Sequence, residues 1–246
     1  MRIIAVCNQK GGTAKTTTTV NLGAALARLG KNVLLIDLDP QGNLTYSFGI
    51  SPTKGTIADV LQGKKKIEDI LEEREGLKVA PGSLLLSDIE ISLVNKIGRE
   101  RILKDKLASL KGFDFVFIDS PPSLSILTVN ALNAAQEVII PAQMEVLSLQ
   151  GLNQLIGTIE EVKAVLNKSL RVGGIVASMY DSRRKLSEEV RGQIQKTMKE
   201  RVFKSVIREC VRIAEAPSFA KSVLTYSPSC NGAEDFLSLA KEFSSN

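Results

Sequence analysis

The chain has 246 residues with a net charge of +5, and 43% of them are hydrophobic while only 4% are aromatic. The sequence contains no His, which excludes a Ser-His-Asp triad, a His general base and a His-ligated metal; its three cysteines are scattered, and we expect reduced structural thiols. No apolar run approaches the roughly 20 residues of a membrane helix, and no signal-peptide pattern is present. We therefore expect a cytoplasmic protein.

Along the chain, apolar runs bounded by turn residues alternate with segments of helical periodicity. The predicted strands are Arg2–Cys7, Asn32–Ile36, Leu77–Ala80, Phe113–Ile118, Glu137–Ile140 and Arg171–Met179. The predicted helices are Lys15–Leu29, Leu84–Leu93, Glu100–Leu110, Ser123–Ala135, Val146–Leu166 and Leu186–Glu200. This alternation predicts a doubly wound α/β fold with a mostly parallel sheet flanked by helices, and ligands at the carboxyl ends of its strands. Because no long linker or repeat interrupts the pattern, we expect residues 1–246 to form a single domain.

The first predicted strand leads into a phosphate-binding loop. The segment Lys10-Gly11-Gly12-Thr13-Ala14-Lys15-Thr16-Thr17 lies between this strand and an apolar-faced helix. Glycines let backbone N–H groups turn toward phosphate oxygens, and the helix N-terminus adds partial positive charge. In such loops the lysine before the helix reaches the β- and γ-phosphates and the following Ser or Thr hydroxyl ligates Mg²⁺, which assigns these roles to Lys15 and Thr16.

The loop departs from the standard pattern G-x-x-x-x-G-K-[ST] at both glycines, where Gln9 and Ala14 stand. An additional lysine, Lys10, makes it the deviant form K-G-G-x-x-K-[ST]. The loop, the later Val20-Asn21-Leu22 and the stretch Val33–Asn43 together resemble the ParA/Soj family of DNA-partitioning ATPases, and the resemblance covers nearly the whole chain. It implies a P-loop ATPase that binds ATP and Mg²⁺ and forms an ATP-dependent homodimer. Thr13 and Ala14 replace the family's Val and Gly, which leaves turnover rate and dimer affinity open.

Two carboxylates end the second predicted strand, in Ile36-Asp37-Leu38-Asp39-Pro40. Alternation along a strand points Asp37 and Asp39 to the same face. Taken alone, such a segment is equally typical of an ordinary strand exit. By the resemblance, Asp39 orients or activates the attacking water, and Asp37 belongs to the magnesium and water shell.

A third carboxylate ends the hydrophobic strand Phe115-Val116-Phe117-Ile118-Asp119, just before Pro121-Pro122. A hydrophobic strand ending in Asp is the Walker B form, whose carboxylate holds Mg²⁺ through water. The loop upstream and the Pro-Pro segment downstream support this interpretation for Asp119. The resemblance gives Lys10 a separate role: it corresponds to the signature lysine that crosses a face-to-face dimer and contacts the partner's nucleotide.

The carboxyl-terminal third is basic. Between Lys163 and Arg212 there are thirteen Lys or Arg and five Asp or Glu, a net charge of +8. Solvated helix faces are often basic, so the excess alone decides nothing. However, Met179-Tyr180-Asp181-Ser182-Arg183 and the segment 211–218 (VRIAEAPS) resemble two family segments whose arginines bind duplex DNA without sequence preference. The resemblance therefore assigns DNA phosphate contacts to Arg183 and Arg212, with Arg184, Lys185 and Arg208 as neighbours.

Met179 and Arg208 are also expected beside the nucleotide, because the family holds adenine near this region. Arg208-Glu209-Cys210 stands where the family often has Pro-Arg-Asn, and acidic Glu209 predicts weaker DNA binding. The resemblance further implies a ParB-type centromere-binding partner that stimulates hydrolysis, and a location on the nucleoid. With no helix-turn-helix segment before the phosphate loop, we expect no operator-binding extension.

Three alternatives remain open at this point. A MinD-like membrane ATPase requires a basic amphipathic C-terminal helix, whereas the segment 233–243 (AEDFLSLAKEF) is acidic on its polar side, so we expect no membrane binding. A metabolic enzyme of the same fold requires bridging cysteines for an iron–sulfur cluster or a small-molecule pocket, neither of which the sequence indicates. A slowly hydrolysing, nucleotide-gated scaffold is compatible with Ala14.

Overall fold

A computed structural model describes residues 1–198 and 201–245 of the chain. Its eight strands form one sheet in the order β3-β4-β2-β5-β1-β6-β7-β8, and all neighbouring strands are parallel except β3 and β4. The strands are β1 Arg2–Val6, β2 Val33–Asp37, β3 Glu72–Arg74, β4 Leu77–Ala80, β5 Phe115–Asp119, β6 Glu137–Gln143, β7 Arg171–Tyr180 and β8 Val202–Arg208. This arrangement confirms the expected doubly wound α/β fold.

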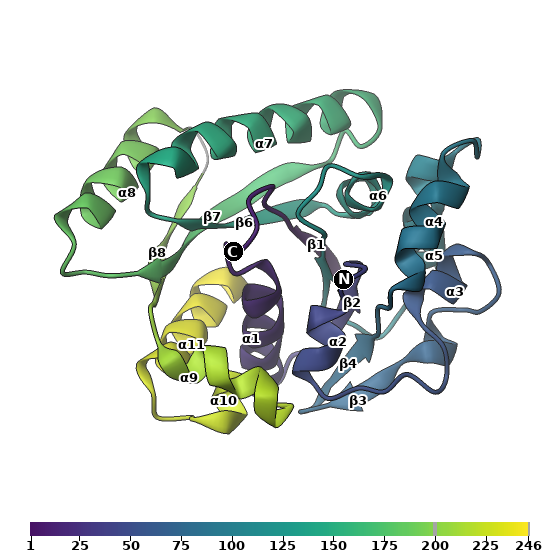
Figure 1. The fold of residues 1–246 in the computed structure, drawn as a ribbon, viewed down its shortest axis with the longest axis horizontal. Helices are drawn as coiled ribbons and strands as arrows, with labels where there is room; N and C mark the ends of the chain where they lie inside the picture. Colours follow the sequence, from purple (N-terminus) through teal and green to yellow (C-terminus); the bar gives the residue numbers. More distant parts are fainter. Residues whose placement is uncertain (199–200, 246) are drawn as a thin grey trace.

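Helices cover both faces of the sheet (Figure 1). The first face carries α3 Ile57–Leu61, α4 Leu85–Leu93, α5 Ile102–Leu107, α6 Ile126–Ala134, α7 Val146–Val165 and α8 Lys185–Thr197. The second face carries α1 Lys15–Arg28, α2 Asn43–Ser47, α10 Val223–Tyr226 and α11 Asn231–Ser244. The helix α9 Val211–Glu215 and the short 3₁₀ segments η1 Glu68–Ile70, η2 Arg99–Arg101 and η3 Ala216–Phe219 complete the chain.

The alternation of side chains in β1 explains why two cores form. Ile3 and Ala5 join the core under α3–α8, whereas Ile4 and Val6 join the core under α1 and α11. Because every strand residue from Ile3 to Val6 is buried, the strand reads as a continuous apolar run, as parallel sheets require. Burial also raises the pKa of the Cys7 thiol to about 12, so this cysteine is a structural thiol at neutral pH.

Two strands, β3 and β8, were not among the strands predicted from the sequence. The edge strand β3 is Glu-Glu-Arg and offers no apolar signal. In β8, Phe203 and Ile207 are buried and Lys204 is exposed, a period-two pattern that the sequence analysis did not use. The predicted helix Leu186–Glu200 ends at Thr197 in the structure, and its last two residues lie outside the described residues. The predicted helix Glu100–Leu110 is split between η2 and the shorter α5.

The C-terminal helix α11 turns its apolar side inward. Phe236, Leu239 and Phe243 are fully or almost fully buried, and the helix packs against α1 and β8. Its apolar face therefore contributes to the second core. Within the described part of the chain, no helix combines the length and apolarity needed to cross a bilayer.

Candidate nucleotide site

The phosphate loop occupies the centre of the sheet edge. Strand β1 lies between β5 and β6, and the loop that follows it leads directly into α1 at Lys15. Two loop residues adopt left-handed backbone conformations, Gly12 with φ 73° and Ala14 with φ 69°. Glycine takes such angles freely, whereas a residue with a Cβ pays roughly 1 kcal/mol or more. Ala14 therefore adopts a left-handed conformation at a cost in backbone strain.

Lys15 is held on the inner side of the loop. Its side chain is almost buried, and its Nζ donates to the carbonyl oxygen of Lys10 at 3.4 Å. Burial lowers the pKa of Lys15, while the negative charges of Asp119 and Asp39 act in the opposite direction. An ammonium group in this position faces carboxylates and the open loop, as a phosphate-binding lysine must.

Asp119 lies directly beside the first turn of α1. Its carboxylate accepts hydrogen bonds from the Thr16 hydroxyl at 2.7 Å and the Thr19 hydroxyl at 3.2 Å. Burial, followed by the charges of Asp37 and Asp39, raises the pKa of Asp119 to about 8. The sheet register explains this proximity, because Asp37 and Asp119 are paired at the adjacent ends of β2 and β5.

Asp37 and Asp39 differ in their surroundings. Asp37 is fully buried, and its Oδ2 accepts from the backbone N–H of Thr45 at 2.8 Å and from the Thr45 hydroxyl at 2.6 Å. Burial raises the pKa of Asp37 to about 6 despite these bonds. Asp39 lines the cavity beside the loop and accepts from the N–H of Gln41 at 2.9 Å. Asp37 thus holds α2 in place through Thr45, whereas Asp39 faces the cavity.

Lys10 lies at the outer end of the loop and has a different set of partners. Its Nζ forms an ion pair with Glu145 at 2.9 Å and contacts Gln143 Oε1 at 3.4 Å. About half of each charged side chain remains exposed, 45% for Lys10 and 54% for Glu145. Gln143 in turn donates to the carbonyl of Gly12 at 3.2 Å and contacts the sulfur of Met179 at 2.9 Å. The ammonium group of Lys10 is therefore held at the surface of the protein, whereas that of Lys15 lies on the inner side of the loop.

The loop opens onto a cavity of about 500 Å³. Residues 11–17 form its floor, and Met179, which has a left-handed φ of 50°, lies on its wall. Residues that sequence reasoning did not assign to the nucleotide complete the walls: Val20 and Asn21 of α1, Gln41, Asn43, Tyr46 and Ser47 near α2, Pro122, Ile213, Ala216, Pro217 and Lys221. The segment 211–218, which the resemblance linked to DNA, thus also supplies apolar side chains to the cavity.

Arg208 does not occupy the position that the sequence suggested. Its guanidinium is turned toward α11, with Nη2 2.6 Å from Asp235 Oδ1 and Nε 2.9 Å from Asp235 Oδ2. The carboxylate of Asp235 also accepts from the backbone N–H of Arg208 at 2.9 Å. The side chain therefore anchors the end of β8 to α11 and is not part of the cavity wall.

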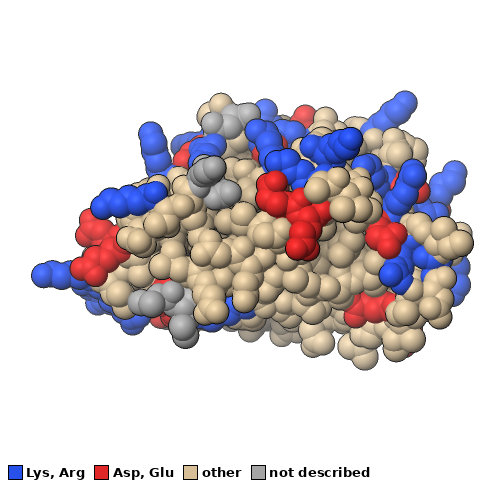
Figure 2. Space-filling model, turned by 90° about the horizontal axis from the view of Figure 1, so that it is seen from above, with Lys and Arg blue, Asp and Glu red and all other residues tan. Residues whose placement is uncertain are grey.

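The other basic residues proposed for DNA project from neighbouring strand ends. Arg183, Arg184 and Lys185 follow β7, and Arg212 follows β8, whose Arg208 is paired with Tyr180 of β7. All four side chains are exposed, although Arg183 and Arg184 contact Asp181 and Arg212 contacts Glu215. Seen from above, Lys and Arg side chains project mainly around the outline of the molecule, and the middle of this face carries few charges (Figure 2).

Comparison with known proteins gives a consistent assignment. A family model described as an AAA domain matches residues 1–172. The sporulation initiation inhibitor protein Soj of Bacillus subtilis (strain 168) is 44% identical over 250 residues, which cover 100% of this chain and 99% of that protein. The chromosome partitioning protein ParA of Caulobacter vibrioides (strain NA1000 / CB15N) is 45% identical over 249 residues, which cover 98% of this chain and 93% of that protein.

A solved structure has the same fold and a ligand in its site. Cobyrinic acid a,c-diamide synthase from Mycobacterium smegmatis, with bound ATP analog and magnesium, superposes with a TM-score of 0.81 and 39% identity, covering 94% of this chain and 98% of that one. Its name is that of a metabolic enzyme, whereas the full-length sequence relatives are partitioning proteins. The chain belongs to the Soj/ParA family of chromosome-partitioning ATPases.

Proposed function

We propose that this protein is an ATP-dependent DNA-partitioning switch. In this proposal one ATP with Mg²⁺ binds in the cavity at the β1–α1 loop, and the loaded protein forms a homodimer that binds duplex DNA without sequence preference. The observation that carries the proposal is the separation of Lys15 and Lys10, one directed into the cavity and the other exposed at the outer end of the loop. A ParB-type partner would stimulate hydrolysis and thereby release the DNA.

The residues around the cavity fit a magnesium nucleotide. Burial raises the pKa of Asp119 and of Asp37, and neighbouring carboxylates raise both further, Asp37 and Asp39 for Asp119 and Asp39 for Asp37, so a cation is favoured beside them. Within the described residues, no group of three His, Cys, Asp or Glu side chains forms a complete metal cage. Mg²⁺ suits such a site because it keeps several waters and relies on one or two protein ligands and substrate phosphates. Thr16 and Asp119 would hold it, Asp119 through water.

The remaining roles follow from position. Loop N–H groups between Gly11 and Thr17 would cradle the phosphates, and Lys15 would neutralise charge on the β- and γ-phosphates. Asp39, on the cavity wall, would orient the attacking water. Lys10 would leave Glu145 and contact the nucleotide of the second subunit. Met179, Ile213 and Pro217 offer an apolar wall to the adenine base.

Duplex DNA would bind through Arg183, Arg184, Lys185 and Arg212. Contacts of this kind neutralise phosphates and carry no base readout. If the dimer neutralises about six phosphates, the slope of log K against log salt would be about −5. Such binding would place the protein on the nucleoid.

Random-sequence duplex DNA tests the proposal directly. Fluorescence anisotropy would be measured with a labelled duplex in the presence of ATP, ADP or no nucleotide, each with Mg²⁺. We expect tight binding with ATP only, and at least about ten-fold weaker binding by an Arg183→Ala/Arg212→Ala variant. Lys31→Ala, an exposed lysine next to α1, is the matched control and should bind as the wild type does. Equal, negligible binding in all three nucleotide states would rule the proposal out.

The strained backbone at Ala14 favours one second candidate, a nucleotide-gated scaffold with very slow turnover. Single-turnover hydrolysis of radiolabelled ATP, with and without DNA and a ParB-type partner, separates the two. A rate that DNA and the partner leave unchanged would support the scaffold, and a rate that they accelerate would support the switch.

A further inference from the structure

One wall of the nucleotide cavity is formed by the segment 213–221, which includes the 3₁₀ turn η3. Ile213, Ala216, Pro217 and Lys221 of this segment line the cavity. The turn is closed by its own backbone, since Lys221 donates its N–H to the carbonyl oxygen of Ala216 at 3.3 Å. We call this segment the 213–221 wall. Its position depends on the contacts that hold its end.

The two residues that follow the 213–221 wall are held by distant parts of the chain. Ser222 and Val223 are completely buried. The carboxylate of Glu75 accepts from the backbone N–H of Ser222 at 3.0 Å and from the Ser222 hydroxyl at 2.5 Å. The N–H of Val223 donates to Oδ1 of Asn21, on α1, at 2.8 Å. The wall is therefore fixed relative to both the helix of the phosphate loop and the β3–β4 hairpin.

Glu75 occupies a backbone position that does not suit glutamate. With Gly76 it forms the two-residue turn between β3 and β4, and the φ values of the two residues are 49° and 76°. Type I′ hairpin turns require positive φ at both positions and favour Asn, Asp or Gly there. In Figure 1 the tip of this hairpin lies beside α10, which begins at Val223. A strained residue of this kind points to a use of its side chain, and both carboxylate oxygens of Glu75 bind Ser222.

We propose that Glu75 is a positioning residue for nucleotide binding. Glu75 is not among the residues that line the cavity, and it acts by holding Ser222, and with it the 213–221 wall, where the wall contacts the nucleoside part of ATP. This inference rests on the place proposed above for adenine, against Ile213 and Pro217. The wall contacts the nucleoside alike before and during hydrolysis, so its loss should weaken ATP binding and spare the rate at saturating ATP.

Two substitutions separate the carboxylate from the backbone strain. Glu75→Gly and Glu75→Ala both remove the bonds to Ser222, but only glycine adopts the left-handed conformation freely. Isothermal titration of the nucleotide-free full chain with a non-hydrolysable ATP analogue and Mg²⁺ should show about ten-fold weaker binding by both variants. Basal ATP turnover at saturating ATP should stay within about two-fold of the wild type. Urea denaturation should rank Glu75→Gly as the more stable of the two variants. Nucleotide affinity would then follow the carboxylate, and stability would follow the backbone.

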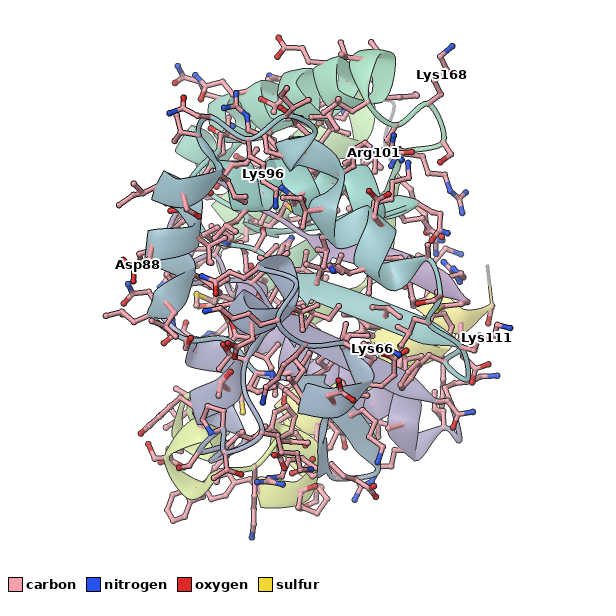
Figure 3. The ribbon with its side chains drawn as sticks, turned by 90° about the vertical axis from the view of Figure 1, so that its right-hand side faces the viewer. Lys66, Asp88, Lys96, Arg101, Lys111 and Lys168 are labelled. Atoms are coloured by element: carbon pink, nitrogen blue, oxygen red, sulfur yellow. The ribbon has the colours of Figure 1, made fainter. Side chains whose placement is uncertain are left out.

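Matched variants show whether the effect passes through Ser222. Ser222→Ala removes one of the two hydrogen bonds and should lose less affinity than Glu75→Gly, and the double variant should bind as Glu75→Gly does. Glu73→Ala, which breaks an exposed ion pair with Lys78 on the same hairpin, should bind as the wild type does. Asp88→Ala should do the same, because Asp88 is exposed on α4 and projects from the outline of the molecule in Figure 3.

Three results would overturn the proposal. They are wild-type affinity in both Glu75 variants, weaker binding by Glu75→Ala alone, and a fall in turnover at saturating ATP as large as the fall in affinity. The second would mean that the backbone and not the carboxylate matters, and the third that Glu75 acts on the reacting groups. Because neither DNA nor a partner protein is present, these results are independent of the test of the partitioning switch.

Discussion

The inner and outer ends of the phosphate loop hold their lysines in contrasting ways. Lys15 is almost buried, faces Asp119 and Asp39, and is fixed by its place at the start of α1. The Lys10 side chain is half exposed, and among the described residues it contacts Gln143 at the end of β6 and Glu145 just after it. A buried ammonium group beside carboxylates is fixed in one position. An exposed ion pair contributes little to stability, and its lysine can readily change partners. In the proposed function, Lys15 therefore binds the nucleotide of its own subunit, and Lys10 is left to contact the nucleotide of a second subunit.

Removing the outer lysine tests the contrast with the largest expected effect. Lys10→Ala should lower stimulated ATP turnover by about 10³-fold, as loss of a cation supplied in trans does. Its affinity for ATP should stay within about three-fold of the wild type, because the inner site is intact. Steady-state phosphate release and nucleotide titration measure the two quantities separately. If Lys10→Ala lost as much ATP affinity as Lys15→Ala, the two lysines would not have the separate roles proposed here.

Removing Lys15 should, in contrast to removing Lys10, act mainly on the affinity for ATP. Lys15→Ala should weaken ATP binding by about 100-fold, since charge-assisted bonds to the phosphates are lost. Isothermal titration with a non-hydrolysable analogue and Mg²⁺ measures this directly. Lys31→Ala serves as the control, and near-normal affinity in Lys15→Ala would show that the loop binds phosphate by another means.

The strain at Ala14 predicts a smaller effect on stability. Ala14→Gly should raise the free energy of unfolding by about 1 kcal/mol, because glycine adopts the left-handed conformation freely. Ala27→Gly, in α1, should lower it by about the same amount, because there the helix favours alanine. Urea denaturation of the nucleotide-free protein gives both values. If the two substitutions changed stability in the same direction, Ala14 would not be strained.

The smallest predicted effect concerns the ion pair between Lys10 and Glu145. Glu145→Gln removes an exposed ion pair worth at most about 1 kcal/mol, so turnover should rise no more than about five-fold. Glu160→Gln breaks a comparable exposed pair with Lys163 on α7 and should leave turnover unchanged. A large loss of activity in Glu145→Gln would instead make Glu145 part of the reacting site.

The sequence predicted the parts of the fold that local patterns determine. Apolar runs located β1 and β5, and the loop motif located Lys15 and Thr16 at the start of α1. The charged edge strand β3 had no such signal, since its pairing with β4 comes from the hairpin. Ile213 and Pro217 joined the cavity wall only through tertiary packing, nearly 200 residues from the loop. Arg208 could not be placed by motif, because its partner Asp235 lies on a separate helix.

A mixing experiment tests most directly whether Lys10 acts across a dimer. Lys10→Ala and Asp39→Ala subunits should each be nearly inactive alone. In a heterodimer, the nucleotide site of the Lys10→Ala subunit retains Asp39 and receives Lys10 from the other subunit. An equal mixture should therefore recover about a quarter of wild-type turnover, because half of the dimers would hold one complete site out of two. A mixture no more active than the two variants measured separately would contradict the account.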